Sequence, residues 1–254
     1  VCPALHIARP LCASLKNENQ TMNKILTFLT ISVILTSCQT QKQSSSIVTS
    51  DIKNFWKAYD EITSTQDSIL QNKYLDSLYL KKGTDGLKAI RQARNYTSQE
   101  YISAINNYPK FWTSIRENTL NADQYSSELE KGIKNLKELY HNVKPAKIYF
   151  TIGALWTNGT TLDSLVLIGS ELALADKETP SNEFPENLSH LRNYFDSEPS
   201  KNIVFLNIHE YVHTQQKTTI GNSLLAQTVL EGVAEFVAEK ALETKSPNPQ
   251  IEFG

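Results

Sequence analysis

Two histidines four residues apart, with a glutamate directly after the first, lie in the stretch NIHEYVHTQQ, from Asn207 to Gln216. On a helix, residues four apart share one face, so the imidazoles of His209 and His213 can reach a single ion. Zinc binds neutral imidazole nitrogens at about 2.0–2.1 Å, and a catalytic zinc site keeps one position open for water. Glu210 could take a proton from that water, which the metal makes more acidic. The pattern therefore predicts a hydrolytic Zn²⁺ site.

Such a site needs a third protein ligand, and the next helical stretch offers one. Residues 222–243 carry Glu231 and, one helical turn further on, Glu235. Seventeen residues separate His213 from Glu231. That length allows a helix end, a loop and about two turns of a second helix, which would bring Glu231 back against the two histidines.

Simpler interpretations of these residues stay open. His209 and His213 could be ordinary core or surface histidines. Glu231 and Glu235 could belong to a solvated helix face, since two further glutamates continue the same row. A purely structural zinc site is disfavoured, because three ligands leave the coordination open and no fourth His or Cys lies nearby.

The elements that must position these residues follow from the apolar spacing. A mostly helical region is expected over 51–145, and its last predicted helices cover 98–108, capped by Ser98, and 126–143. Strand-forming residues fill 146–156 and 163–174, with turn chemistry at 158–161 between them. Helices are then expected over 201–217 and over 222–243, the latter capped by Asn222 or Ser223. The fold class is therefore α+β, mainly helical, with a small sheet before the histidine helix.

The first fifty residues predict a targeting signal followed by a flexible tether. The only methionine, Met22, begins MNKILTFLTISVILTSC, with a positive start, a short apolar run and small residues before Cys38. We interpret 1–21 as an upstream extension, 22–38 as a signal peptide and 39–50 as a flexible tether. The end of the signal resembles the lipobox of bacterial lipoproteins, which implies that Cys38 is lipidated. This predicts a lipid-anchored protein of the cell envelope, on the periplasmic face or the outer-membrane surface.

Composition narrows the partners. The chain has 254 residues and a net charge of −2, with both signs of charge spread along it, so no basic stripe indicates nucleic acid. All three cysteines fall within the first 38 residues, which excludes a disulfide framework or a cysteine metal site in the body of the protein. The oligomeric state is not predicted.

The combined pattern, His209-Glu210-x-x-His213 followed by Glu231-x-x-x-Glu235, resembles the gluzincin branch of zinc metallopeptidases. More narrowly, the chain is similar to predicted zinc-dependent protease lipoproteins of Bacteroidota. The resemblance implies a zincin-like domain over 146–254, with Glu231 as the third zinc ligand and Glu235 supporting the first histidine.

The same resemblance implies a strand at the edge of the sheet that aligns a substrate, for which 147–152 or 164–168 are candidates. Gluzincins also place a His, Tyr or Arg after the third ligand, and no such residue follows His213 here. Tyr149 or Tyr211 could take that role from upstream. The sequence ends 23 residues past Glu231, and we expect the domain to be truncated at its C-terminus.

The leading functional hypothesis is a membrane-anchored zinc metallopeptidase that acts on a peptide or protein substrate, with Glu210 as general base. The alternative is a non-catalytic envelope lipoprotein that keeps a zincin-like shell and serves as a binding or accessory component of secretion or motility machinery. The absence of an oxyanion-stabilising residue after His213 favours the alternative, whereas Glu210 favours the enzyme.

Overall fold

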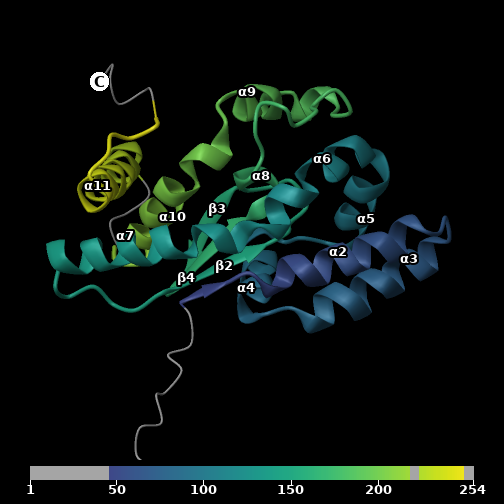
Figure 1. Cartoon of the computed structure of the whole chain (residues 1–254), viewed down its shortest axis with the longest axis horizontal. Coiled ribbons are helices and arrows are strands. Elements are labelled where there is room, and N and C mark those ends of the chain that lie inside the picture. The colour runs from purple at the N-terminus through teal and green to yellow at the C-terminus, as the bar shows by residue number, and fades with distance from the viewer. Residues whose placement is uncertain (1–45, 218–222, 249–254) are drawn as a thin grey trace, which may run out of the picture. The chain divides into compact units, whose positions relative to one another are not determined.

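The computed structural model describes residues 46–217 and 223–248, which are mainly helical with one small mixed sheet (Figure 1). This confirms the predicted α+β class. The α-helices are α2 (Ser50–Thr63), α3 (Ser68–Tyr74), α4 (Asp85–Arg94), α5 (Ser98–Asn107), α6 (Pro109–Leu120), α7 (Ser126–Leu139), α8 (Ser170–Ala173), α9 (His190–Asp196), α10 (Ile203–His213) and α11 (Leu224–Leu242). Short π and 3₁₀ segments join them: η1 (Leu75–Tyr79), η2 (Leu80–Lys82), η3 (Ala122–Tyr125), η4 (Glu186–Leu188) and η5 (Pro199–Asn202). The strands are β1 (Ile47–Val48), β2 (Lys147–Thr151), β3 (Gly159–Leu162) and β4 (Leu165–Gly169).

Local sequence signals explain where several helices begin. Thr97 rather than Ser98 caps α5, and it forms a capping box in which Thr97 and Glu100 each accept the other's backbone N–H. Pro109 opens α6, where a missing N–H leaves no helical hydrogen bond unmade. Ser223, one of the two predicted caps of α11, accepts the backbone N–H three residues further on at 3.2 Å.

The strands that the structure describes form a sheet in the order β1-β2-β4-β3. β1 and β4 run parallel to β2, and β3 runs antiparallel to β4. The predicted strands over 146–156 and 163–174 contain β2 and β4, which are neighbours in the sheet, but the turn expected between them at 158–161 is wrong, because β3 begins inside that stretch. The tight turn lies instead at Asp163 and Ser164, and Asp163 has a φ of 53°, which aspartate tolerates in turns.

This strand order also corrects the expected edge strand. The predicted candidates, 147–152 and 164–168, correspond to β2 and β4, which are the two inner strands of the described sheet. The edge beside the histidine helix is β3. Sequence patterns favoured the inner strands because a strand buried on both faces has a strongly apolar composition, whereas the short β3 sequence GTTL does not.

Helices cover both faces of the sheet. α4 packs on the face that carries Tyr149, since a Cβ built at Gly86 of α4 would come within 2.2 Å of the Tyr149 side chain. α10 packs on the other face, where a Cβ built at Gly159 of β3 would lie 3.0 Å from Oε1 of Glu210. Strand register places Phe150, not Tyr149, on the Gly159 face, because successive side chains alternate.

An aromatic cluster joins the helical half to the same core. Phe55 of α2 lies 5.1 Å from Trp112 of α6 and 5.3 Å from Tyr79 of η1, measured between ring centroids. All three side chains are fully buried. The Tyr79 hydroxyl donates a hydrogen bond to the carbonyl of Ile152, just past the end of β2. The helices over 51–145 and the sheet therefore share one continuous core.

Part of the predicted tether is folded. Ile47 and Val48 pair with β2, and α2 begins at Ser50, so residues 46–50 of the expected 39–50 tether belong to the fold. Ile47 is buried. Ile47 and Val48 are both apolar and β-branched, and such residues favour a strand. The predictions for 1–21, for 22–38 and for Cys38 lie outside the described residues. No helix in 46–217 or 223–248 combines the length and apolar character needed to cross a bilayer.

A buried carboxyl group holds the loop between β2 and β3. Glu171 of α8 is fully buried and accepts the backbone N–H groups of Gly153 at 2.9 Å and Leu155 at 3.2 Å. Leu155 has a φ of 66°, an uncommon conformation for a residue other than glycine. Burial raises the pKa of Glu171 from 4.5 to about 7, although the two N–H donors favour the ionised form.

The raised pKa predicts how stability changes with pH. Between pH 4.5 and about 7, the folded protein holds a proton on Glu171 that the unfolded chain has lost, so the free energy of unfolding should fall as pH rises. Protonation of Glu171 should contribute on the order of 3 kcal/mol to the free energy of unfolding at low pH. Denaturant melts at pH 5 and pH 8 should show a smaller difference in Glu171→Gln than in the wild type. The exposed Glu178→Gln serves as control, and an unchanged difference in Glu171→Gln would contradict the assignment.

Candidate metal centre

The two histidines of α10 meet at their Nε2 atoms. α10 spans Ile203–His213, so His209 and His213 lie one turn apart on the same face, as predicted. Their Nε2 atoms are 3.0 Å apart, and the imidazole planes are inclined at 79°. Both side chains are mostly buried, with exposed fractions of 15% and 17%. Two ring nitrogens thus converge on one small volume.

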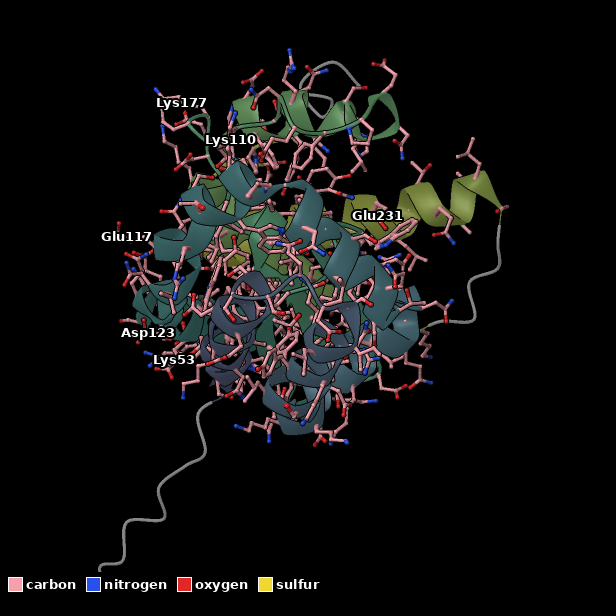
Figure 2. The ribbon with its side chains drawn as sticks, turned by 90° about the vertical axis from the view of Figure 1, so that its right-hand side faces the viewer. Lys53, Lys110, Glu117, Asp123, Lys177 and Glu231 are labelled. Atoms are coloured by element: carbon pink, nitrogen blue, oxygen red, sulfur yellow. The ribbon has the colours of Figure 1, made fainter. Side chains whose placement is uncertain are left out.

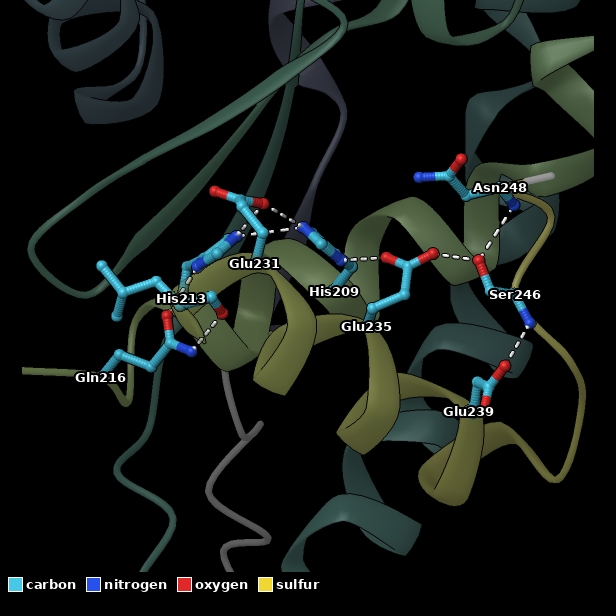
Figure 3. A network of polar contacts seen from close by, with 9 residues as sticks. His209, His213, Gln216, Glu231, Glu235, Glu239, Ser246 and Asn248 are labelled. Atoms are coloured by element: carbon cyan, nitrogen blue, oxygen red, sulfur yellow. Dashed lines mark hydrogen bonds and ion pairs between the residues drawn. The ribbon is translucent and has the colours of Figure 1, made fainter. Parts of the chain in front are cut away.

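Glu231 reaches the same volume from α11. Its Oε2 atom lies 3.3 Å from Nε2 of His209 and 3.3 Å from Nε2 of His213 (Figure 3). Figure 2 shows Glu231 on the part of α11 that adjoins the rest of the fold. The carboxylate is 61% exposed, so the centre opens to solvent on this side. Structure and sequence agree that these three residues, from two helices, come together.

The donor set suits a divalent transition metal. The candidate ligand atoms of His209, His213 and Glu231 all lie within 4.8 Å of one another. Two imidazoles and one carboxylate are zinc ligands, and three protein donors leave a position open. Burial, and next the neighbouring His213, lower the pKa of His209, which favours the neutral imidazole that binds a metal.

Glu235 holds the far side of the His209 ring. Its Oε2 atom lies 2.7 Å from Nδ1 of His209, an ion-pair distance without the alignment of a linear hydrogen bond. The Ser246 hydroxyl donates to the other oxygen of Glu235, and the Ser246 N–H donates to Glu239 at 2.8 Å. Glu235 is 8% exposed. A carboxylate at Nδ1 keeps the proton there and leaves Nε2 free to bind the ion.

Gln216 plays the matching part for His213, and sequence analysis missed it. Its Nε2 donates to the carbonyl of Leu230 at 2.8 Å, which fixes the amide orientation so that Oε1 accepts from Nδ1–H of His213 at 2.7 Å. Leu230 directly precedes Glu231, so one glutamine links the ring of one ligand to the backbone of another (Figure 3). Gln216 lies three residues beyond His213, the last residue of α10, so the sequence places it near that ring but does not reveal its bond to Leu230.

Glu210 lies against β3. Its Oε1 atom is close to the strand, since a Cβ built at Gly159 would lie 3.0 Å from it, a tight contact. Burial raises the pKa of Glu210 to about 7. Glu210, His213 and Glu231 line one cavity of about 320 Å³. The predicted base therefore lies beside the centre.

The predicted oxyanion candidates are engaged elsewhere. The Tyr211 hydroxyl accepts the backbone N–H of Ala146 at 3.0 Å and is used to attach α10 to the segment before β2. The Tyr149 ring packs against Gly86 of α4, on the face of the sheet opposite α10. Neither tyrosine lines the cavity of the metal centre. The stabilising group that a peptidase needs is therefore not supplied by either residue.

One family model matches the chain over residues 37–254, and its description is gliding motility protein GldB. No curated protein and no solved structure matches the chain. The matched family is not a family of gluzincin metallopeptidases. The predictions of a gluzincin and of an enzyme that cleaves peptide bonds are therefore wrong, as are the terms hydrolase, protease and metalloprotease. The alternative prediction, a non-catalytic envelope lipoprotein of motility machinery, agrees better with the match.

The contacts of Gln216 generate a testable prediction about the centre. Gln216→Leu should lower the affinity for Zn²⁺ about 10- to 100-fold, because the ring of His213 loses the acceptor that fixes its proton on Nδ1. Competition with a chromophoric chelator measures the affinity. Gln227→Leu, which removes an amide from the wall of the same cavity, should leave it unchanged. Equal affinity in Gln216→Leu and wild type would show that Gln216 does not orient the ligand.

Proposed function

Because the chain belongs to the family of gliding motility protein GldB, we propose that it is a lipid-anchored, non-catalytic component of the gliding machinery in the cell envelope. The family match carries this proposal, since it extends from residue 37 to residue 254 and includes every residue of the metal centre. Its partners are then the membrane and other proteins of the machinery.

The sequence of the first residues supports the anchor. The matched range begins one residue before Cys38, the cysteine that ends the predicted signal peptide. Lipidation at Cys38 would attach the chain to a membrane without a spanning helix, and a single signal of this kind needs further contacts for stable attachment. The envelope location follows from the family, and Cys38 is the residue that we assign to it.

We further propose that the protein keeps a zincin-like shell, in which the small sheet, α10 and α11 surround a Zn²⁺ ion. The convergence of Nε2 of His209, Nε2 of His213 and Oε2 of Glu231 supports this. When bound, zinc would act here as a cross-link between two helices and as a Lewis acid for one further ligand. His209 and His213 would hold it from α10, and Glu231 from α11.

Metal analysis tests the centre directly. The purified protein should contain close to one zinc per chain, and both His213→Ala and Glu231→Ala should lose it, because each removes one of only three protein ligands. Glu210→Gln should retain the zinc, since Glu210 is not a ligand. Elemental analysis on protein of verified fold by circular dichroism is the measurement. Folded wild-type protein without bound metal would remove the zinc proposal and leave the envelope role standing.

Motility separates a binding role from catalysis. In a gliding host that lacks this chain, the wild-type gene should restore spreading on agar, whereas Cys38→Ala should not. Glu210→Gln should restore spreading to the wild-type extent, because a non-catalytic component needs no general base. Cells with His213→Ala should spread less than wild type if the zinc cross-link between α10 and α11 is needed for function. Loss of spreading in Glu210→Gln with normal protein level and zinc content would contradict the non-catalytic role.

A further inference from the structure

The cavity beside the metal centre is lined by two basic residues, Arg94 and Lys217. It lies between β3 and α10, has a volume of about 320 Å³, and is lined by residues that include Arg94, Thr160, Glu210, Lys217 and Glu231. A cavity of this size is at the small end of ligand-binding sites. It therefore suits one end of a chain or a small molecule rather than a protein surface.

A relay of hydrogen bonds holds Arg94 at this cavity. Nη2 of Arg94, at the end of α4, donates to Oγ1 of Thr157 at 3.4 Å. The buried Thr157 hydroxyl in turn donates to the carbonyl of Gly159 at 2.6 Å. Gly159 is the residue of β3 that meets Glu210, so the guanidinium is tied to the strand that forms the cavity. This contact uses only one of the five N–H donors of the guanidinium, so the others can bind a ligand.

The charges of the cavity favour an anion only when the metal is present. With Glu210 ionised, the two cations Arg94 and Lys217 are balanced by the two carboxylates Glu210 and Glu231. A divalent ion held by His209, His213 and Glu231 would add positive charge that these groups do not compensate, and the exposed Glu231 side chain leaves the centre open to solvent. An anion in this cavity could pair with Arg94, whose planar fork matches a carboxylate.

We propose that the metal-loaded cavity binds a carboxylate group, with Arg94 as the residue that recognises it. A doubly charged phosphate is disfavoured, because Glu210 and Glu231 already place negative charge in the same small volume. The carboxylate is that of a protein C-terminus or of a free organic acid, both of which fit the cavity. This inference rests on the proposed zinc centre and specifies the chemistry of the partner that the centre receives.

Calorimetric titration of the zinc-loaded protein tests the inference. The peptide acetyl-Ala-Ala-Ala with a free C-terminus should bind, and its C-terminal amide should bind at least about 10-fold more weakly, since a charge-assisted pair is lost. Arg94→Gln should weaken the free acid by a similar factor, and Arg94→Lys by less, because it keeps the charge. Lys88→Gln removes a cation from the exposed side of α4, where Lys88 pairs with Asp85, and should change nothing.

Further arms identify the source of the carboxylate. Succinate that binds as tightly as the peptide would indicate a free organic acid, and weaker succinate binding would indicate a protein C-terminus. Metal-free protein should bind neither. Inorganic phosphate that binds more tightly than either carboxylate would overturn the proposed ligand class.

The outcomes also separate this inference from the proposed function. Equal binding of acid and amide, or unaltered binding in Arg94→Gln with zinc retained, overturns the carboxylate site and leaves the zinc centre standing. A protein that takes up no zinc fails both. In cobalt-substituted protein, the visible spectrum should change when the peptide acid is added, because the ligand enters beside the ion. An unchanged spectrum at saturating peptide would place the carboxylate away from the metal and overturn the inference.

Discussion

The packing of α11 against α10 is the constraint on which the candidate site depends. α11 turns a face of alanines inward, and Ala234, Ala238 and Ala241 are fully buried. Small side chains allow a short distance between helix axes. Across this packing, Oε2 of Glu231 lies 3.3 Å from Nε2 of both histidines. A larger residue on this face would displace Glu231, and metal sites tolerate displacements of only about 0.2 Å in their ligand distances.

Both ligand rings are held by groups that belong to α11 or are bonded to it. Glu235, which contacts Nδ1 of His209, lies on α11, and Ser246 beyond the end of α11 donates to Glu235. Gln216 holds His213 and bonds the α11 backbone at Leu230. Ring orientation and helix position are therefore one property: if α11 moves, both rings lose their partners together. Arg94 and Gly159 of β3 also line the cavity, and Thr157 links the Arg94 side chain to the start of that strand.

The parts of the site that sequence predicted are the parts that local geometry determines. The spacing of His209 and His213 fixes a shared helix face, and the distance to Glu231 fits a helix, a loop and a return. β3 was missed because its sequence resembles a turn, and its strand character depends on pairing with β4. Gln216 was missed because its role requires the carbonyl of Leu230, which only the tertiary structure brings near.

The peptidase prediction failed for a different reason. The motif specifies where ligands and a carboxyl group stand, but it does not specify the groups that stabilise a transition state, and those determine catalysis. Here the two tyrosines that could have served are used in packing and in attaching α10. Function therefore had to come from the match over residues 37–254 rather than from the motif.

Glu210 remains the residue that a non-catalytic role must explain, because a binding protein has no need for a general base. The structure gives it a packing role. Its carboxyl group lies against Gly159 of β3, and burial there raises its pKa to about 7. Near neutrality a large share of Glu210 is therefore uncharged, which lowers the cost of burying it between helix and strand. A base poised near neutral pH and a buried carboxyl that spaces two elements have the same titration, so the raised pKa by itself does not argue for catalysis.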